Sequence, residues 1–118
     1  MRHRAITAAL AAAITAGCST GPINAPPRVK YPREAATVTV QRTSSIVGLP
    51  ATMFFVINDE RIYGLLNGQS WSFQIDPQEY RFGYDLGFNS CRQRVILRPN
   101  KRYLLELPPV CDIEPREL

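Results

Sequence analysis

The sequence predicts an all-β protein: a single small antiparallel β-sandwich of about seven strands, placed after a cleaved signal peptide and a proline-rich tether. From Ala35 to about Leu107 hydrophobic residues recur with a period of two, and no segment after the leader has a helical period. Turn-forming Gly, Pro, Asn and Asp residues separate these runs at intervals of about ten residues, which is typical of a sandwich. A small β-barrel is the alternative.

The predicted strands follow one another along residues 36–107. Ala36, Val38 and Val40 alternate with polar residues in the first, and the run 52–57 is apolar on both faces, as in a central strand. The later strands are expected at 61–66, 70–75, 80–86, 91–98 and 103–107. Asn67-Gly68 is the strongest hairpin signal in the chain.

The turn at Pro99-Asn100 is expected to make the last two strands an antiparallel pair, which would bring Cys91 close to Cys111. A disulfide between them would close a loop of about 20 residues and stabilise the domain by roughly 3 kcal/mol. It would also pin the acidic tail 112–118. Two unpaired buried thiols are the alternative.

Residues 1–17 have the pattern of a lipoprotein signal peptide. Arg2 and Arg4 precede an alanine-rich stretch, 5–15, that is too short to span a bilayer. The sequence Ala16-Gly17-Cys18 resembles the bacterial lipobox, with Thr15 in the slot that usually holds an aliphatic residue. Lipidation of Cys18 by three acyl chains, palmitate among them, would hold the protein stably on a membrane. The alternative is ordinary signal-peptidase cleavage near residues 11–13.

Residues 18–34 are predicted to be an extended tether, because they contain four prolines and no hydrophobic period. The domain is then expected over residues 35–118. Ser19 stands where an aspartate would signal inner-membrane retention, so the expected location is the outer membrane, with the domain facing the periplasm or exposed at the surface.

The charge balance argues against a nucleic-acid partner. The formal net charge is +4, but two of the 14 Lys and Arg residues lie in the leader and all 10 Asp and Glu residues follow it, which leaves 12 basic against 10 acidic residues. A protein that binds nucleic acid needs a net-positive face to neutralise phosphates.

The residue types also argue against catalysis. His3 is the only histidine and leaves with the leader, which excludes Ser-His-Asp and Cys-His arrangements and zinc sites that contain histidine. Turn chemistry accounts for Asp59 and Asp76. We therefore expect no catalytic residues, no metal and no cofactor.

Two groups of residues are candidates for contact with a partner. Arg92, Arg94 and Arg98 are predicted to share one face of the penultimate strand, either as a basic stripe for an acidic partner or as solvated edge charges. Ile46, Val47 and Leu49 place aliphatic side chains in a loop that does not need them.

The run from V-T-V-Q-R-T-S-S-I-V-G through F-V-I-N-D-E-R-I-Y-G-L-L-N-G-Q-S-W-S-F-Q-I-D-P-Q-E-Y to V-I-L-R-P-N-K-R-Y-L-L-E-L resembles a family of small bacterial lipoproteins. Its members carry a β-sandwich of unknown function that is similar to PEGA-type and carboxypeptidase-regulatory modules. Gln78 stands where glycine is usual in that family. The resemblance implies a fold and a lipid anchor, and no catalytic residues.

Taken together, these features predict a membrane-anchored envelope lipoprotein that acts as a non-catalytic binding or scaffolding module, with a protein partner in the envelope. The alternative is a periplasmic inhibitor that protects against an attacking enzyme or phage. The sequence leaves the oligomeric state and the identity of the partner open.

Overall fold

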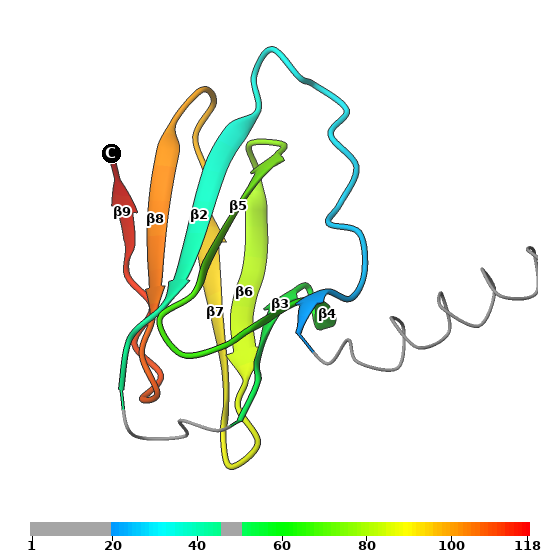
Figure 1. Cartoon of the computed structure of the whole chain (residues 1–118). Coiled ribbons are helices and arrows are strands. Elements are labelled where there is room, and N and C mark those ends of the chain that lie inside the picture. Colours follow the sequence, from blue (N-terminus) through cyan, green and yellow to red (C-terminus); the bar gives the residue numbers. More distant parts are fainter. Residues whose placement is uncertain (1–19, 46–50) are drawn as a thin grey trace, which may run out of the picture.

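The protein is a two-layer β-sandwich (Figure 1). The computed structural model describes residues 20–45 and 51–118, and all seven predicted strands form, with a short strand added at each end. The strands are β1 (Gly21–Pro22), β2 (Ala36–Arg42), β3 (Met53–Ile57), β4 (Glu60–Leu65), β5 (Ser70–Ile75), β6 (Glu79–Asp85), β7 (Ser90–Ile96), β8 (Arg102–Leu107) and β9 (Pro115–Glu117). No helix within the described ranges is long and apolar enough to span a bilayer.

The strands form a first sheet in the order β1-β4-β3-β6-β7 and a second sheet in the order β5-β2-β8-β9. The sheets stay separate, so the structure is a sandwich rather than a barrel. All pairs are antiparallel except β2 and β8, which run parallel from Thr37 opposite Arg102 to Arg42 opposite Leu107. The predicted β-sandwich is confirmed, with this one parallel pair among its antiparallel ones.

Three turns that follow predicted strands cross between the sheets instead of closing hairpins. The Asn67-Gly68 turn leads from β4 in the first sheet to β5 in the second, so the predicted hairpin is wrong. The turn itself forms, with Gly68 at φ +76°, but both edges of β4 are already occupied by β3 and β1. The other two crossings are β5 to β6 and β7 to β8, so the last two long strands are not a hydrogen-bonded pair.

The inward faces of the two sheets form one core, on the residues that the alternation predicted. Phe55, Phe73 and Phe82 meet near its centre, with ring centroids 5.8 Å apart for Phe55 and Phe73 and 5.6 Å apart for Phe55 and Phe82. Burying a side chain of this size contributes about 1.5–3 kcal/mol. Packing across the two sheets therefore supplies the main stabilisation of the fold.

The C-terminal tail is part of the sandwich. Ile113 is fully buried in the core, and residues 115–117 pair with β8 as β9. The side chain of Gln93 on β7 hydrogen bonds to the backbone N–H and carbonyl of Ile113, which links the edges of the two sheets. The tail therefore has its own apolar anchor besides the disulfide.

The described part of the predicted tether also lies against the domain. Gly21 and Pro22 pair with Gly64 and Tyr63 of β4, on the edge of that strand opposite β3. Farther on, the Asp76 carboxylate accepts the backbone N–H groups of Lys30 and Tyr31 at 3.0–3.1 Å. Parts of the segment expected as a tether, residues 21–22 and 30–31, therefore contact the domain.

Candidate functional site

A connected group of charged side chains lies on the outer face of the first sheet and is centred on Arg92 of β7. Arg92 stands opposite Gly83 of β6, where a Cβ atom would clash with the backbone oxygen of Cys91. Because no side chain rises at Gly83, the guanidinium of Arg92 reaches back to the carbonyls of Tyr84 and Cys91, at 3.1 and 2.9 Å from Nη1.

The same guanidinium joins two carboxylates. Its Nε lies 3.1 Å from Asp59 in the β3–β4 turn, and its Nη2 lies 2.9 Å from Asp85 at the end of β6. Asp59 also accepts Arg81 at 2.8 Å, and Asp85 accepts Arg61 at 2.9 Å. We call these five side chains the Arg92 network.

Two further contacts shape this face. The guanidinium of Arg61 lies over the ring of Phe54, 4.4 Å from its centroid, which is a cation–π geometry. Burial raises the pKa of Asp85, but hydrogen bonds and charge from Arg61 and Arg92 outweigh it, so the net pKa lies below the usual value. The Arg92 network therefore favours the ionised form of Asp85 and holds its arginines in place.

The structure only partly assembles the predicted basic stripe. Arg94 lies two residues beyond Arg92 on the same outward face and pairs with Glu79 at 3.0 Å. Arg98 follows the end of β7 and pairs with Glu117 of β9, in the other sheet, at 2.8 Å. Since each arginine meets a carboxylate, this face carries mixed charge rather than a run of unpaired positive charge.

The predicted bridge is present: Cys91 and Cys111 are bonded, with their Cα atoms 5.2 Å apart. The expected antiparallel pairing of the two strands around Pro99-Asn100 is wrong, because β7 and β8 lie in different sheets. The bond joins the start of β7 in the first sheet to the segment after β8 in the second. It therefore ties the two layers together at one edge, where Gln93 and Ile113 also meet.

Four of the predicted residues lie outside the described residues: Cys18, Ile46, Val47 and Leu49.

Sequence reasoning missed Arg42, which is 2% exposed at the end of β2. Its Nη1 donates to the carbonyls of Ala51 and Leu65, at 2.6 and 2.9 Å, and burial lowers its pKa. Its burial could have been predicted from its position, because Arg42 continues the inward series of Ala36, Val38 and Val40. The arginine at this position hydrogen bonds to the backbone just before β3 and at the end of β4.

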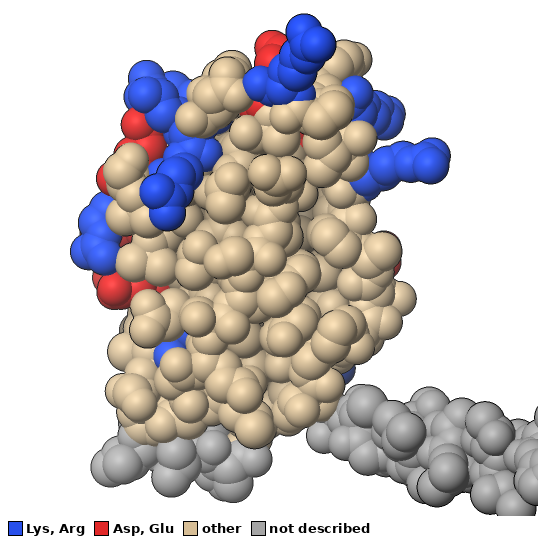
Figure 2. Space-filling model, turned by 45° about the horizontal axis from the view of Figure 1, so that its top comes forward, with Lys and Arg blue, Asp and Glu red and all other residues tan. Residues whose placement is uncertain are grey.

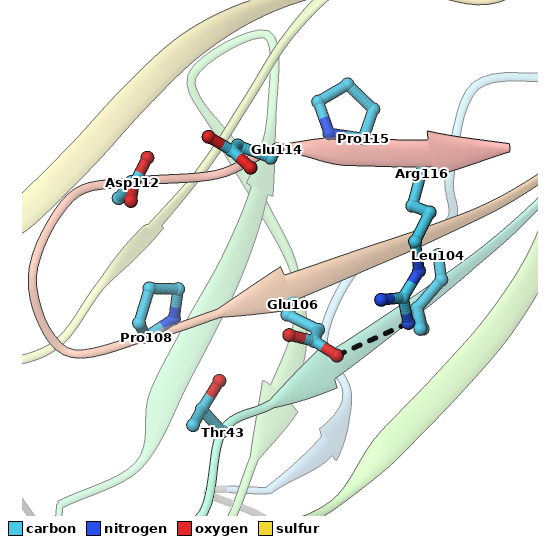
Figure 3. A pocket seen from close by; sticks show the side chains of 8 residues that line it. All are labelled: Thr43, Leu104, Glu106, Pro108, Asp112, Glu114, Pro115 and Arg116. Carbon is cyan, nitrogen blue, oxygen red and sulfur yellow. Dashed lines mark ion pairs between the residues drawn. The ribbon is translucent and has the colours of Figure 1, made fainter.

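A shallow pocket of about 440 Å³ lies on the outer face of the second sheet, beside β8 and β9 (Figure 3). Glu106, Asp112 and Glu114 border it, and Arg116 reaches Glu106 at 3.6 Å. Figure 3 shows Glu106 on β8, apart from Asp112 and Glu114 on the segment that leads to β9. In residues 20–45 and 51–118 no three His, Cys, Asp or Glu side chains are grouped to hold a metal ion.

A second hollow, of about 290 Å³, lies where the N-terminal segment meets Asp76. The hydroxyl of Tyr80 donates to the carbonyl of Asp76 at 2.7 Å, and burial together with the Asp76 charge raises the pKa of Tyr80 to about 12. Tyr80 therefore keeps its proton and holds the turn.

No protein-family model and no curated protein sequence matches the chain. Among solved structures, the fold is similar to the N-terminal domain of AlgF from P. aeruginosa, with a TM-score of 0.54 and 17% sequence identity. The match covers 75% of this chain and 98% of that domain. At this identity the similarity concerns the fold alone: this chain has the sandwich architecture of that domain.

Proposed function

We propose that this protein is a lipid-anchored envelope protein whose sandwich is a non-catalytic binding or scaffolding module. Its partner is another protein of the envelope, which contacts the outer face of the first sheet. The observation that carries the proposal is the Arg92 network, in which charges of both signs are held in a defined arrangement on that face.

Energetics support a role in recognition. An exposed ion pair contributes only about 0–1 kcal/mol to stability, so the main physical effect of the network is the fixed orientation of its groups. Groups that are already oriented lose less entropy when a partner binds, and complementary charges select the partner and fix its register. The mixed charge suits a protein surface better than a polyanion.

The location rests on the leader. A basic start, an apolar stretch and Ala-Gly-Cys are the pattern of a lipoprotein signal, and lipidation at Cys18 would keep the domain at a membrane. Absence of Asp at position 19 favours the outer membrane.

The test is crosslinking in intact cells, followed by detergent extraction and affinity recovery of the full-length tagged protein. We expect a reproducible partner with the wild-type protein, strongly reduced recovery with Arg92→Ala, and unchanged recovery with Arg116→Ala. Arg116 is the matched control because it is an exposed arginine with a single carboxylate partner, outside the network.

Far-UV circular dichroism of both variants checks that they fold. Recovery of nothing above background with the wild type, or equal recovery with folded Arg92→Ala, would contradict the proposal.

A further inference from the structure

The two ends of the sandwich differ in charge. At one end, in the upper part of Figure 1, the β5–β6 and β7–β8 turns carry charged residues, among them Asp76 and Lys101. The segments that pass through the other end, residues 62–75, 86–91 and 107–111 and the described residues 43–45 and 51–57, contain no Lys, Arg, Asp or Glu. We call the described loop residues there (43–45, 51–52, 66–69, 86–89 and 108–111) the uncharged end.

Arg42, which directly precedes residues 43–45 of this end, is buried. Arg42 is the last residue of β2, and its guanidinium is directed to the carbonyls of Ala51 and Leu65 beneath the loops. Two carboxylates flank these loops in the chain: Asp85 ends β6 just before residues 86–89, and Asp112 directly follows residues 108–111. On the face shown in Figure 2, charged side chains gather in the upper part and along one edge, and the lower part is almost free of them.

Hydrogen bonds and the disulfide join these loops to one another. The backbone N–H of Ser45 donates to Asn67 at 2.9 Å, and the side chain of Asn89 donates to the carbonyl of Pro109 at 2.8 Å. The bond between Cys91 and Cys111 lies beside this second contact. The loops are therefore held in place with their apolar side chains facing outward.

Three large apolar side chains are exposed there: Leu66 at 41%, Phe88 at 62% and Val110 at 74%. Each belongs to a different loop of the uncharged end. Exposed apolar residues that gather without charged neighbours mark a contact surface.

The chain also enters the domain at this end. Gly21 pairs with Gly64, one residue before the last residue of β4. Cys18 precedes Gly21 by three residues, and a fully extended chain of that length spans at most roughly 11 Å. An acyl group on Cys18 therefore cannot lie far from the uncharged end.

We propose that the uncharged end rests directly on the bilayer and places Leu66, Phe88 and Val110 in the headgroup region. The occupant of this surface is a zwitterionic lipid interface, since the described loops contain no cation for anionic headgroups and Asp85 at the rim is paired with Arg61 and Arg92. The proposal rests on the proposed function, specifically on lipidation at Cys18. The anchor then also orients the domain, with the charged turns directed away from the membrane.

The experiment uses the full mature protein, extracted from host membranes and reconstituted into phosphatidylcholine vesicles with brominated acyl chains, which quench tryptophan fluorescence on contact. Phe88→Trp is compared with Ile96→Trp, each corrected for the native Trp71 by subtracting the wild-type signal. Ile96 is the matched control because it is 69% exposed and ends β7 at the charged end.

We expect the tryptophan at position 88 to be quenched several-fold more than the one at position 96, and Val110→Trp to behave like Phe88→Trp. Equal quenching at positions 88 and 96 in protein that floats with the vesicles would contradict the proposed orientation of the domain. It would not contradict the lipid anchor at Cys18. Shielding of position 88 from aqueous iodide without quenching by the lipid would mean that protein covers this end, which would also contradict the proposed orientation.

Flotation separates this inference from the proposed function. Wild-type protein should float with vesicles, and Cys18→Ser should stay in solution. If the wild type does not float, the anchor itself is absent, and the proposed function fails together with the orientation.

Discussion

Arg92 donates to the carboxylate of Asp85 across 2.9 Å, from β7 to the neighbouring strand β6. Because Asp85 has a lowered pKa in the folded protein, it favours folding whenever it is ionised. This contribution is present above the unfolded pKa of about 3.9 and is lost as the pH falls through the lower folded pKa.

Asp85→Asn should therefore remove part of the loss of stability on acidification. The free energy of unfolding, measured by urea titration between pH 2 and 7, should fall less steeply below about pH 4 than in the wild type. Asp112→Asn, an exposed carboxylate outside the Arg92 network, should leave the slope unchanged. A wild-type slope in Asp85→Asn would show that the pair does not contribute.

The disulfide should contribute more than any surface ion pair. Cys91→Ser combined with Cys111→Ser should lower the free energy of unfolding by roughly 3 kcal/mol, from the chain entropy of a loop of about 20 residues. Mass spectrometry after digestion without reductant should show the two cysteine peptides linked. Recovery of both as free thiols would contradict the bridge.

The strands and their inward faces could be predicted because alternation is local: Tyr80, Phe82 and Tyr84 are buried as the period of two requires. The pairing of the strands could not be predicted in this way, because pairing depends on which strand edges are free. Asn67-Gly68 makes its turn, yet β5 crosses to β2 because β1 and β3 already flank β4. The Asn67-Gly68 signal is local and does not indicate which strand edges are free.

Only part of the candidate site could be predicted from the sequence, for the same reason. Arg92 and Arg94 could be placed on one outward face from the period of β7, but their partners are distant in sequence: Asp59 in the β3–β4 turn and Glu79 at the start of β6. The tail was expected to depend on the disulfide alone, since a single isoleucine among polar residues gives no periodic signal. Ile113 nevertheless reaches the core beside Gln93.

Truncation of that isoleucine should therefore be costly. Ile113→Ala should destabilise the protein by about 2–5 kcal/mol, because it leaves a cavity in a close-packed core. Val110→Ala, three residues earlier and 74% exposed, should change the unfolding midpoint little. Equal effects of the two substitutions would show that the tail does not pack as described.

The N-terminal segment gives a further prediction, through Asp76. Asp76→Ala removes the acceptor for the backbone N–H groups of Lys30 and Tyr31, so residues 28–33 should become accessible to protease. Limited trypsin digestion should cut the variant faster after Arg28 and Lys30 than the wild type. Tyr80→Phe, which keeps the carboxylate but loses its own bond to the Asp76 carbonyl, separates this contact from the stability of the turn. Unchanged cleavage in Asp76→Ala would show that this contact does not hold the segment.

The most direct test of the whole account is mass spectrometry of the N-terminal peptide of protein purified from bacterial membranes. A lipid-anchored module should give a mature chain that begins at Cys18 and carries acyl chains, and Cys18→Ser should move the protein from the membrane to the soluble fraction. A mature chain that begins elsewhere, or an unmodified Cys18 in membrane-bound protein, would contradict it.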